Sequence, residues 1–151
     1  MERIPYSELP EGIFEPLMAI EEKLKNSSLD NKLLELVRLR VSQINGCAYC
    51  LDMHTKELKH AGESEIRISL LSAWEESGFF DEKEKAVLHF AEALTVIDDK
   101  PLHNDVFETL QKHFDKHEIS FLSLAIAQIN TWNRLMKSFG FKAGNYEVAQ
   151  V

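Results

Sequence analysis

Residues 31–54 read NKLLELVRLRVSQINGCAYCLDMH, and this stretch decides the fold. Between about residues 30 and 44, apolar side chains cover much of the circumference of a helix, which is typical of a helix at the centre of a bundle. Asn45-Gly46 then interrupts the helical pattern. A further helix is predicted over residues 47–60. The stretch therefore predicts two helices joined by a break, with the first of them central.

Helical patterns occupy the rest of the chain as well. Only 6 Gly and 4 Pro interrupt the 151 residues, and no stretch keeps the alternation of a strand for long. Further helices are predicted over residues 11–25, 64–74, 104–115 and 117–139 and after a cap at Asp81. Residues 140–151 are predicted to form an irregular tail. We therefore expect residues 1–151 to be a single all-α domain, a compact bundle of about six to eight helices.

The acidic character of the chain limits its partners. It carries 17 Lys and Arg against 25 Asp and Glu, which gives a net charge of −8 at pH 7. An acidic surface argues against nucleic acid and anionic membranes as main partners. No apolar run approaches the ~20 residues that span a bilayer, and residues 1–10 lack the pattern of a secretory signal. We expect a cytoplasmic protein with neither nucleic-acid nor membrane partners.

The two cysteines form the most informative motif. Cys47 and Cys50 are the only cysteines, and residues three apart on a helix are neighbours at ~5–6 Å between Cβ atoms. A disulfide tolerates Cα separations of roughly 4.4–6.8 Å, so the pair can close with modest adjustment. The pair also begins a helix, where free N–H groups and the helix dipole favour a thiolate. Such a position lowers a cysteine pKa from ~8.5 toward neutrality and creates a nucleophile.

Two titratable side chains accompany the cysteines. His54 follows Cys50 by four residues on the same face, and histidine exchanges protons near neutral pH. Glu35 would lie ~18 Å from Cys47 along a straight helix, so the break after the central helix must fold the next helix back. The apolar neighbours of Glu35 predict partial burial, which would raise the pKa of its carboxyl group and suit it to acid–base chemistry.

Each of these residues also has a plainer interpretation. The cysteines would be buried thiols of the core, and His54 would be a packing or surface histidine. Glu35 would be the ion-pair partner of Arg38, three residues further on. Two Cys, one His and one Glu would also make four zinc ligands, although the usual second Cys or His pair is missing. No G-x-G-x-x-G or P-loop pattern is present, so neither a cofactor nor a metal is expected. The residues alone leave these alternatives open.

The four side chains resemble the motif of the alkylhydroperoxidase D-like proteins, which belong to the carboxymuconolactone decarboxylase superfamily. The motif reads Glu35-x11-Cys47-x2-Cys50-x3-His54, with Asn45 and Tyr49 in their places. The spacing from Glu to the first Cys makes the likeness far more specific than an isolated Cys-x-x-Cys. The all-helical layout and the segment from Asp81 to Thr95 extend it over most of the chain.

The resemblance implies an all-α fold built on a helical hairpin core and assembly into homo-oligomers, either trimers or hexamers. It also implies peroxidase or disulfide reductase activity without haem or flavin. Cys50 would be the activated thiolate, Cys47 would resolve it to a disulfide, and Glu35 and His54 would relay protons. The apolar helix over residues 117–139 agrees with assembly, although the core of one bundle would also account for it.

The resulting hypothesis is an antioxidant dithiol oxidoreductase that reduces an alkyl hydroperoxide and is re-reduced by an external thiol or dithiol protein. A second hypothesis is a non-catalytic redox sensor or thiol-switched binding protein, in which the same disulfide changes assembly. A carboxymuconolactone-type decarboxylase is a further enzyme alternative. It would need cationic and polar groups that bind an acid, and the sequence does not assign them.

Overall fold

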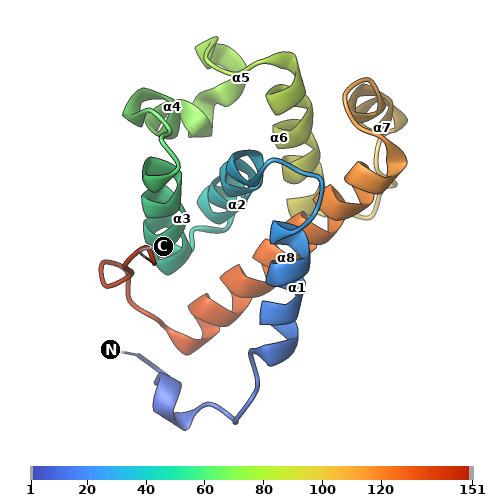
Figure 1. Ribbon diagram of the computed structural model, residues 1–151. Helices are drawn as coiled ribbons and strands as arrows, with labels where there is room; N and C mark the ends of the chain where they lie inside the picture. The colour runs from blue at the N-terminus through green and yellow to red at the C-terminus, as the bar shows by residue number, and fades with distance from the viewer. Residues whose placement is uncertain (1, 150–151) are drawn as a thin grey trace.

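The computed structural model describes residues 2–149, and this part of the chain is helical throughout with no strand. The α-helices are α1 (Glu15–Lys25), α2 (Asn31–Asn45), α3 (Ala48–His60), α4 (Glu65–Leu70), α5 (Trp74–Ser77), α6 (Glu82–Thr95), α7 (Asn104–Gln111) and α8 (Lys116–Phe139). Two short 3-10 helices, Tyr6–Glu8 and Leu71–Ala73, complete them. Figure 1 shows these elements as one bundle. The prediction of an all-α helical bundle is confirmed.

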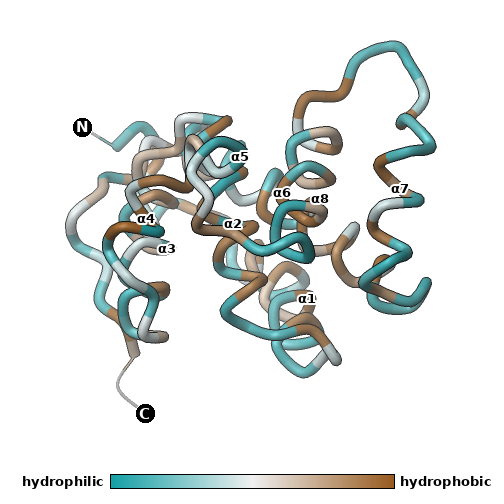
Figure 2. The backbone as a smooth tube through the Cα atoms, turned by 90° about the horizontal axis from the view of Figure 1, so that it is seen from above, coloured by the Kyte–Doolittle hydropathy of each residue, from teal (hydrophilic) through white to brown (hydrophobic). Residues whose placement is uncertain are grey.

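α2 lies at the centre of this bundle. Helices α3, α6 and α8 pack around it (Figure 1), and Figure 2 shows α3 and α4 on one side of it with α6 and α8 on the other. Its buried apolar residues point to all of these neighbours: Leu33, Leu34, Leu36, Val37, Leu39 and Val41. Burial of apolar surface contributes ~25 cal/mol per Å², so these buried residues of α2 anchor the fold.

A left-handed corner joins α2 to α3. Gly46 has φ 60° and ψ 43°, a conformation that residues with a Cβ rarely adopt. The N–H groups of Gly46 and Cys47 donate to the carbonyls of Gln43 and Ser42 and so complete the last turn of α2. α3 therefore turns back along α2, as the position of Glu35 in the sequence required.

Two of the predicted helices are shorter or divided in the structure. Residues 11–14 form turns, with Gly12 at φ 72°, so the helix predicted over residues 11–25 begins at Glu15. The helix predicted over residues 64–74 is divided into α4, a 3-10 turn and α5. The tighter turn brings apolar side chains of both the 3-10 turn and α5 into the core against α2 and α3.

The last two predicted helices differ from the observed ones at one boundary. The helix predicted over residues 104–115 ends at Gln111, because Asp115 caps the next helix through a capping box with Glu118. α8 then covers the predicted range 117–139.

Most of the apolar surface of α8 is covered within one chain. Its buried apolar residues are Ile119, Leu122, Ala125, Ile126, Ile129, Met136 and Phe139. The bundle core thus accounts for this helix, and the homo-oligomer stays a prediction. No helix within residues 2–149 is long and apolar enough to cross a membrane.

Candidate active site

The two thiols lie at the start of α3 under an apolar cover. Cys47 is the residue before the helix, and Cys50 lies in its first turn. Both are free cysteines, and only 1% and 2% of their surfaces are exposed. They pack against Met136 and Phe139 of α8. The pair is therefore shielded from bulk water, yet it sits at the end of a helix that favours negative charge.

The two thiols share one negative charge. A hydrogen bond from the Cys50 thiol lowers the pKa of Cys47 to about 7, although burial opposes this shift; the backbone N–H of Cys50 and the charge of Lys137 also lower it. The same contact, together with burial, raises the pKa of Cys50. The dithiol as a pair therefore releases its first proton more readily than an isolated cysteine does.

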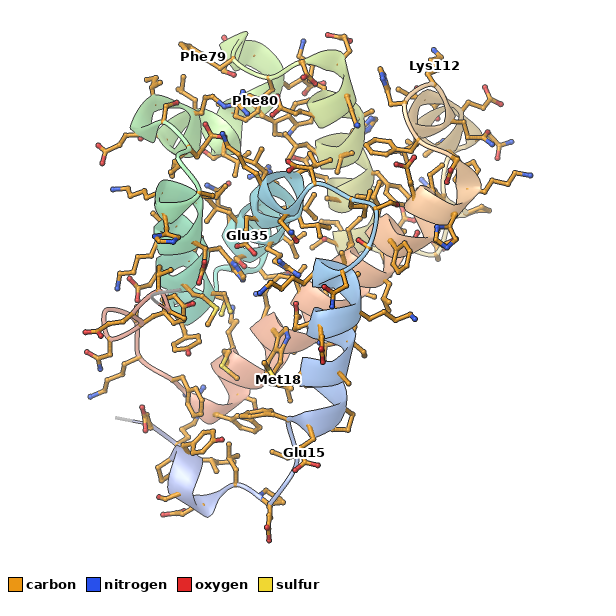
Figure 3. The ribbon with its side chains drawn as sticks, in the orientation of Figure 1. Glu15, Met18, Glu35, Phe79, Phe80 and Lys112 are labelled. Carbon is orange, nitrogen blue, oxygen red and sulfur yellow. The ribbon has the colours of Figure 1, made fainter. Side chains whose placement is uncertain are left out.

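The fold-back of α3 brings His54 to Glu35. Nδ1 of His54 and Oε2 of Glu35 are 2.7 Å apart. His54 lies one turn beyond Cys50 and is buried, and Glu35 lies between α2 and α3 in Figure 3. The structure therefore joins two of the predicted site residues that the sequence separates by 19 positions.

The second oxygen of Glu35 is bound by Arg38. Nη1 of Arg38 lies 2.5 Å from Oε1 of Glu35, and its Nη2 lies 2.8 Å from the carboxylate of Glu21 on α1. Glu21 also accepts a hydrogen bond from the indole N–H of Trp132 at 2.8 Å. Both interpretations of Glu35, as a partner of Arg38 and as a partner of His54, are therefore realised in one network.

This network shifts the pKa of Glu35 in the direction opposite to the predicted one. Burial opposes its ionisation, but the hydrogen bonds and positive charge of His54 and Arg38 outweigh burial and lower the pKa of Glu35. The prediction that burial would raise this pKa was wrong, because the contacts with His54 and Arg38 compensate the lost hydration. Glu35 is therefore a carboxylate that can orient and stabilise a protonated His54, rather than a proton donor.

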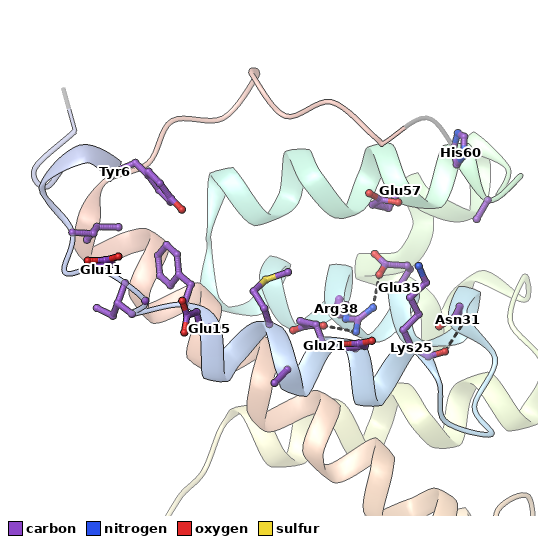
Figure 4. Close-up of a pocket in the computed structure, with 18 of the residues that line it drawn as sticks. Tyr6, Glu11, Glu15, Glu21, Lys25, Asn31, Glu35, Arg38, Glu57 and His60 are labelled. Carbon is purple, nitrogen blue, oxygen red and sulfur yellow. Dashed lines mark hydrogen bonds and ion pairs between the residues drawn. The ribbon is translucent and has the colours of Figure 1, made fainter.

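A cavity of about 570 Å³ reaches these side chains. Its wall includes Cys50, His54 and Glu35, whereas Cys47 is not among the described residues that line it. A larger groove of about 1230 Å³ runs between α1 and α3 and shares Glu35 with this cavity (Figure 4). Of the two cysteines, Cys50 is therefore the one next to a small molecule in the cavity.

The segment after α8 closes one side of this cavity. Phe141 lines the cavity, and the hydroxyl of Tyr146 donates to Glu57 of α3. Lys56 donates to the carbonyl of Tyr146 at 2.8 Å. Burial and the contact with Glu57 raise the pKa of Tyr146. The tail is irregular over residues 140–149, as predicted, and residues 150–151 lie outside the described part; its contacts with the site had no signal in the sequence.

Asn133 of α8 is a site residue that the sequence analysis missed. It is 1% exposed, its Nδ2 donates to Ser42 Oγ at 3.0 Å, and its Oδ1 accepts from Asn45 Nδ2 at 2.9 Å. The hydroxyl of Ser42 itself donates to the carbonyl of Arg38, so Ser42 can only accept from the amide. These contacts fix the amide orientation, and a hydrogen bond from Asn133 lowers the pKa of both thiols.

Replacing Asn133 with Ala is therefore expected to raise the first apparent pKa of the dithiol, by about half a unit to one unit. Ultraviolet thiolate absorbance as a function of pH measures this value. Asn130→Ala is the matched control, because Asn130 also accepts from Asn45 at 2.9 Å, from the same helix, but lowers neither thiol pKa. Equal titration curves for both variants and the parent protein would contradict the assignment.

The described residues do not bring metal ligands together. Within residues 2–149, no group of three or more His, Cys, Asp and Glu side chains is placed to hold a metal ion. This part of the chain therefore offers no set of ligands for the zinc ion of the alternative interpretation.

A helical bundle with a dithiol at a helix corner, beside a His–Glu pair, defines a class of all-α thiol proteins. Residues 11–93 match the carboxymuconolactone decarboxylase family, and the chain belongs to this family. It is 39% identical to the uncharacterized protein YdfG of Bacillus subtilis (strain 168), over 95% of this chain and 98% of that protein.

Solved structures support the alkylhydroperoxidase-like branch of the family. A protein of unknown function from Agrobacterium tumefaciens, described as a candidate antioxidant defence protein AhpD, superposes with a TM-score of 0.91 at 40% identity. The superposition covers 97% of this chain and 100% of that chain. The resemblance stated from the motif is thereby confirmed.

One structural relative has a different chemistry. The debrominase Bmp8 superposes with a TM-score of 0.73 at 15% identity, over 87% of this chain and 70% of that chain. At this identity the likeness shows the fold alone. The reaction of the present protein must therefore be argued from its own side chains.

Proposed function

We propose that the protein is a dithiol peroxidase that reduces organic hydroperoxides and is re-reduced by an external thiol or dithiol protein. One observation carries the proposal: a single cavity has Cys50, His54 and Glu35 in its wall, and Cys47 shares a hydrogen bond with Cys50 behind that wall. A nucleophile, an oriented proton carrier and a resolving thiol are the groups that this reaction needs.

Cys50 is the attacking sulfur in this proposal, because it faces the cavity. Its proton passes to the Cys47 thiolate, to which it already donates a hydrogen bond. The Cys50 thiolate then attacks one oxygen of the hydroperoxide, and the O–O bond breaks. The departing alkoxide takes a proton from a protonated His54, whose charge the carboxylate of Glu35 stabilises, and leaves as an alcohol. Cys50 is left as a sulfenic acid.

Cys47 then resolves the sulfenic acid. Its sulfur attacks the sulfur of Cys50, the S–O bond breaks, and the leaving hydroxide receives the proton of Cys47 through His54 and departs as water. The product is a Cys47–Cys50 disulfide. Two external thiols, or one dithiol, return two electrons and two protons and become a disulfide themselves.

Turnover distinguishes this proposal from the redox sensor. The purified protein is mixed with cumene hydroperoxide and excess dithiothreitol, and the remaining hydroperoxide is followed over time. We expect many equivalents of hydroperoxide to be consumed per protein. Consumption of a single equivalent, with no further reaction in the presence of the dithiol, would contradict catalysis and favour the sensor.

We also propose that the protein works in the cytoplasm as a homo-oligomer, a trimer or a hexamer. Two exposed apolar side chains at the larger groove, Tyr6 at 71% and Met18 at 56%, support a covering partner there. The molecular mass in solution tests this proposal, and the mass of a single chain across a range of concentrations would contradict it.

A further inference from the structure

The cavity beside Cys50 carries a surplus of negative charge. Its wall contains the carboxylates of Glu21, Glu35 and Glu57, and Arg38 is the only Lys or Arg among the described residues that line it. Protonation of His54 adds one positive charge at most. The wall is therefore negative whether His54 is neutral or charged.

Arg38 is not available to a substrate. Its two guanidinium nitrogens lie 2.5 Å from Glu35 and 2.8 Å from Glu21, and only 12% of its side chain is exposed. A substrate carboxylate could reach this guanidinium only by displacing one of the two protein carboxylates. Replacing a protein ion pair by a ligand ion pair offers no net gain in charge pairing and adds the cost of removing the ligand from water.

The groove that leads to the cavity also carries a surplus of negative charge. Figure 4 shows the groove between α1 and α3 that leads to Glu35. The carboxylates that line it outnumber the cations two to one: Glu11, Glu15, Glu21, Glu22, Glu35 and Glu57 against Lys25, Lys32 and Arg38. An anion is therefore repelled before it reaches the thiol.

The remaining wall of the cavity is apolar and aromatic. Phe14, Tyr49, Trp132 and Phe141 line it, together with three methionines. Its volume of about 570 Å³ lies within the range of ~300–1,000 Å³ that is usual for sites of organic ligands. The space therefore suits an aromatic or branched apolar group next to the reacting oxygen atoms.

We propose that the site takes uncharged organic hydroperoxides with a bulky apolar group and rejects those that carry a carboxylate. The peroxide part rests on the proposed function, whereas the selection by charge belongs to the cavity itself. The same selection excludes lactone acids, so it also argues against decarboxylase chemistry in this cavity.

Two alkylating reagents of nearly equal size test the charge selection without any peroxide. Iodoacetamide is neutral and iodoacetate is an anion. The reduced protein is treated with each, the rate of modification at Cys50 is followed by peptide mass, and the ratio of the two rates is compared with that of a small neutral thiol. We expect the protein to favour iodoacetamide by about tenfold beyond the small thiol. Equal ratios for the protein and the small thiol would overturn the proposal.

Glu57→Gln removes one carboxylate of the wall without touching the thiols, His54 or Glu35. We expect it to reduce the preference for iodoacetamide about threefold. Glu22→Gln is the matched control, because Glu22 lines the outer groove but not the cavity, and we expect it to change the ratio by less than twofold. An unchanged ratio in the Glu57→Gln variant would count against the proposed origin of the selection.

Cumene hydroperoxide and its ring-carboxylated analogue then test the substrate class. We expect the neutral compound to be consumed at least about tenfold faster. Equal consumption of both compounds would overturn the inference and leave the peroxidase standing. If the alkylation experiment shows charge selection but neither hydroperoxide is consumed, the proposed peroxidase activity is wrong and the charge selection of the cavity stands.

Discussion

The Cys50→Ser variant is expected to lose hydroperoxide turnover completely, whereas Cys47→Ser is expected to react once and stop when no external thiol is added. The reason is the position of the two sulfurs: Cys50 lines the cavity and Cys47 does not. Without Cys50, the hydroperoxide meets no nucleophile. Without Cys47, the sulfenic acid on Cys50 has no neighbouring thiol with which to form a disulfide.

A sulfenic-acid-specific reagent followed by peptide mass measurement distinguishes the two sulfurs. The label is expected on Cys50 in the Cys47→Ser variant and is expected to be absent in Cys50→Ser. Because the pKa of Cys47 is lowered to about 7, Cys47 is the credible competitor for the first reaction. If Cys47 in the Cys50→Ser variant were labelled as fast as the parent protein reacts with the hydroperoxide, Cys47 would be the sulfur that attacks first. Turnover by the variant with both cysteines replaced by Ser would show that the assignment of the active site is wrong.

The Glu35→Gln variant is expected to reduce the turnover rate about 100-fold while the protein remains folded. Glutamine can still hydrogen-bond to Nδ1 of His54, but it cannot stabilise the positive charge of a protonated imidazole. Glu21→Gln is the matched control, because it removes the other carboxylate on Arg38 and leaves the 2.7 Å contact between Glu35 and His54 in place. Its rate should stay within a few-fold of the parent rate. Equal losses in both variants would mean that Glu35 acts only through Arg38.

The lowered pKa of Glu35 also predicts a pH dependence of stability. Its folded-state pKa lies below the ordinary value of 4.5, so the folded protein binds this proton less readily than the unfolded chain does. The stabilisation is therefore fully present above that value and is lost as the pH falls through the lowered one. The parent protein should exceed Glu35→Gln in free energy of unfolding at neutral pH, and the difference should shrink below about pH 4. Urea unfolding at both pH values measures it; a constant difference would contradict the assigned shift.

Much of the fold could be read from residues 31–54. The apolar residues around α2 indicated a central helix, and Asn45-Gly46 indicated its end. The argument that Glu35 must approach the thiols predicted the direction of α3, and the left-handed corner at Gly46 turns the chain back in that direction. The cap at Asp81 also falls where the sequence placed it. The helix pattern, its end and the cap are local, because each depends on side chains within a few positions of each other; the direction of α3 followed from the spacing between Glu35 and Cys47.

Other parts of the site come from distant segments and have no spacing that identifies them. Glu21 and Trp132 meet although 111 positions separate them, and Asn133 reaches Ser42 from 91 positions away. Tyr146 contacts Glu57 from a tail without regular structure. The prediction of the Glu35 pKa was wrong for a different reason: the sequence offered Arg38 and His54 as alternative partners of Glu35 but did not show that both would bind its carboxylate at once.

Free-thiol titration before and after one equivalent of cumene hydroperoxide tests the central claim most directly. The reduced protein should present two reactive thiols, lose both on addition of the hydroperoxide, recover both with a dithiol reductant, and repeat this cycle many times. Thiols that remain unreactive in the folded protein would show that Cys47 and Cys50 are buried structural residues, and the proposed peroxidase would be wrong.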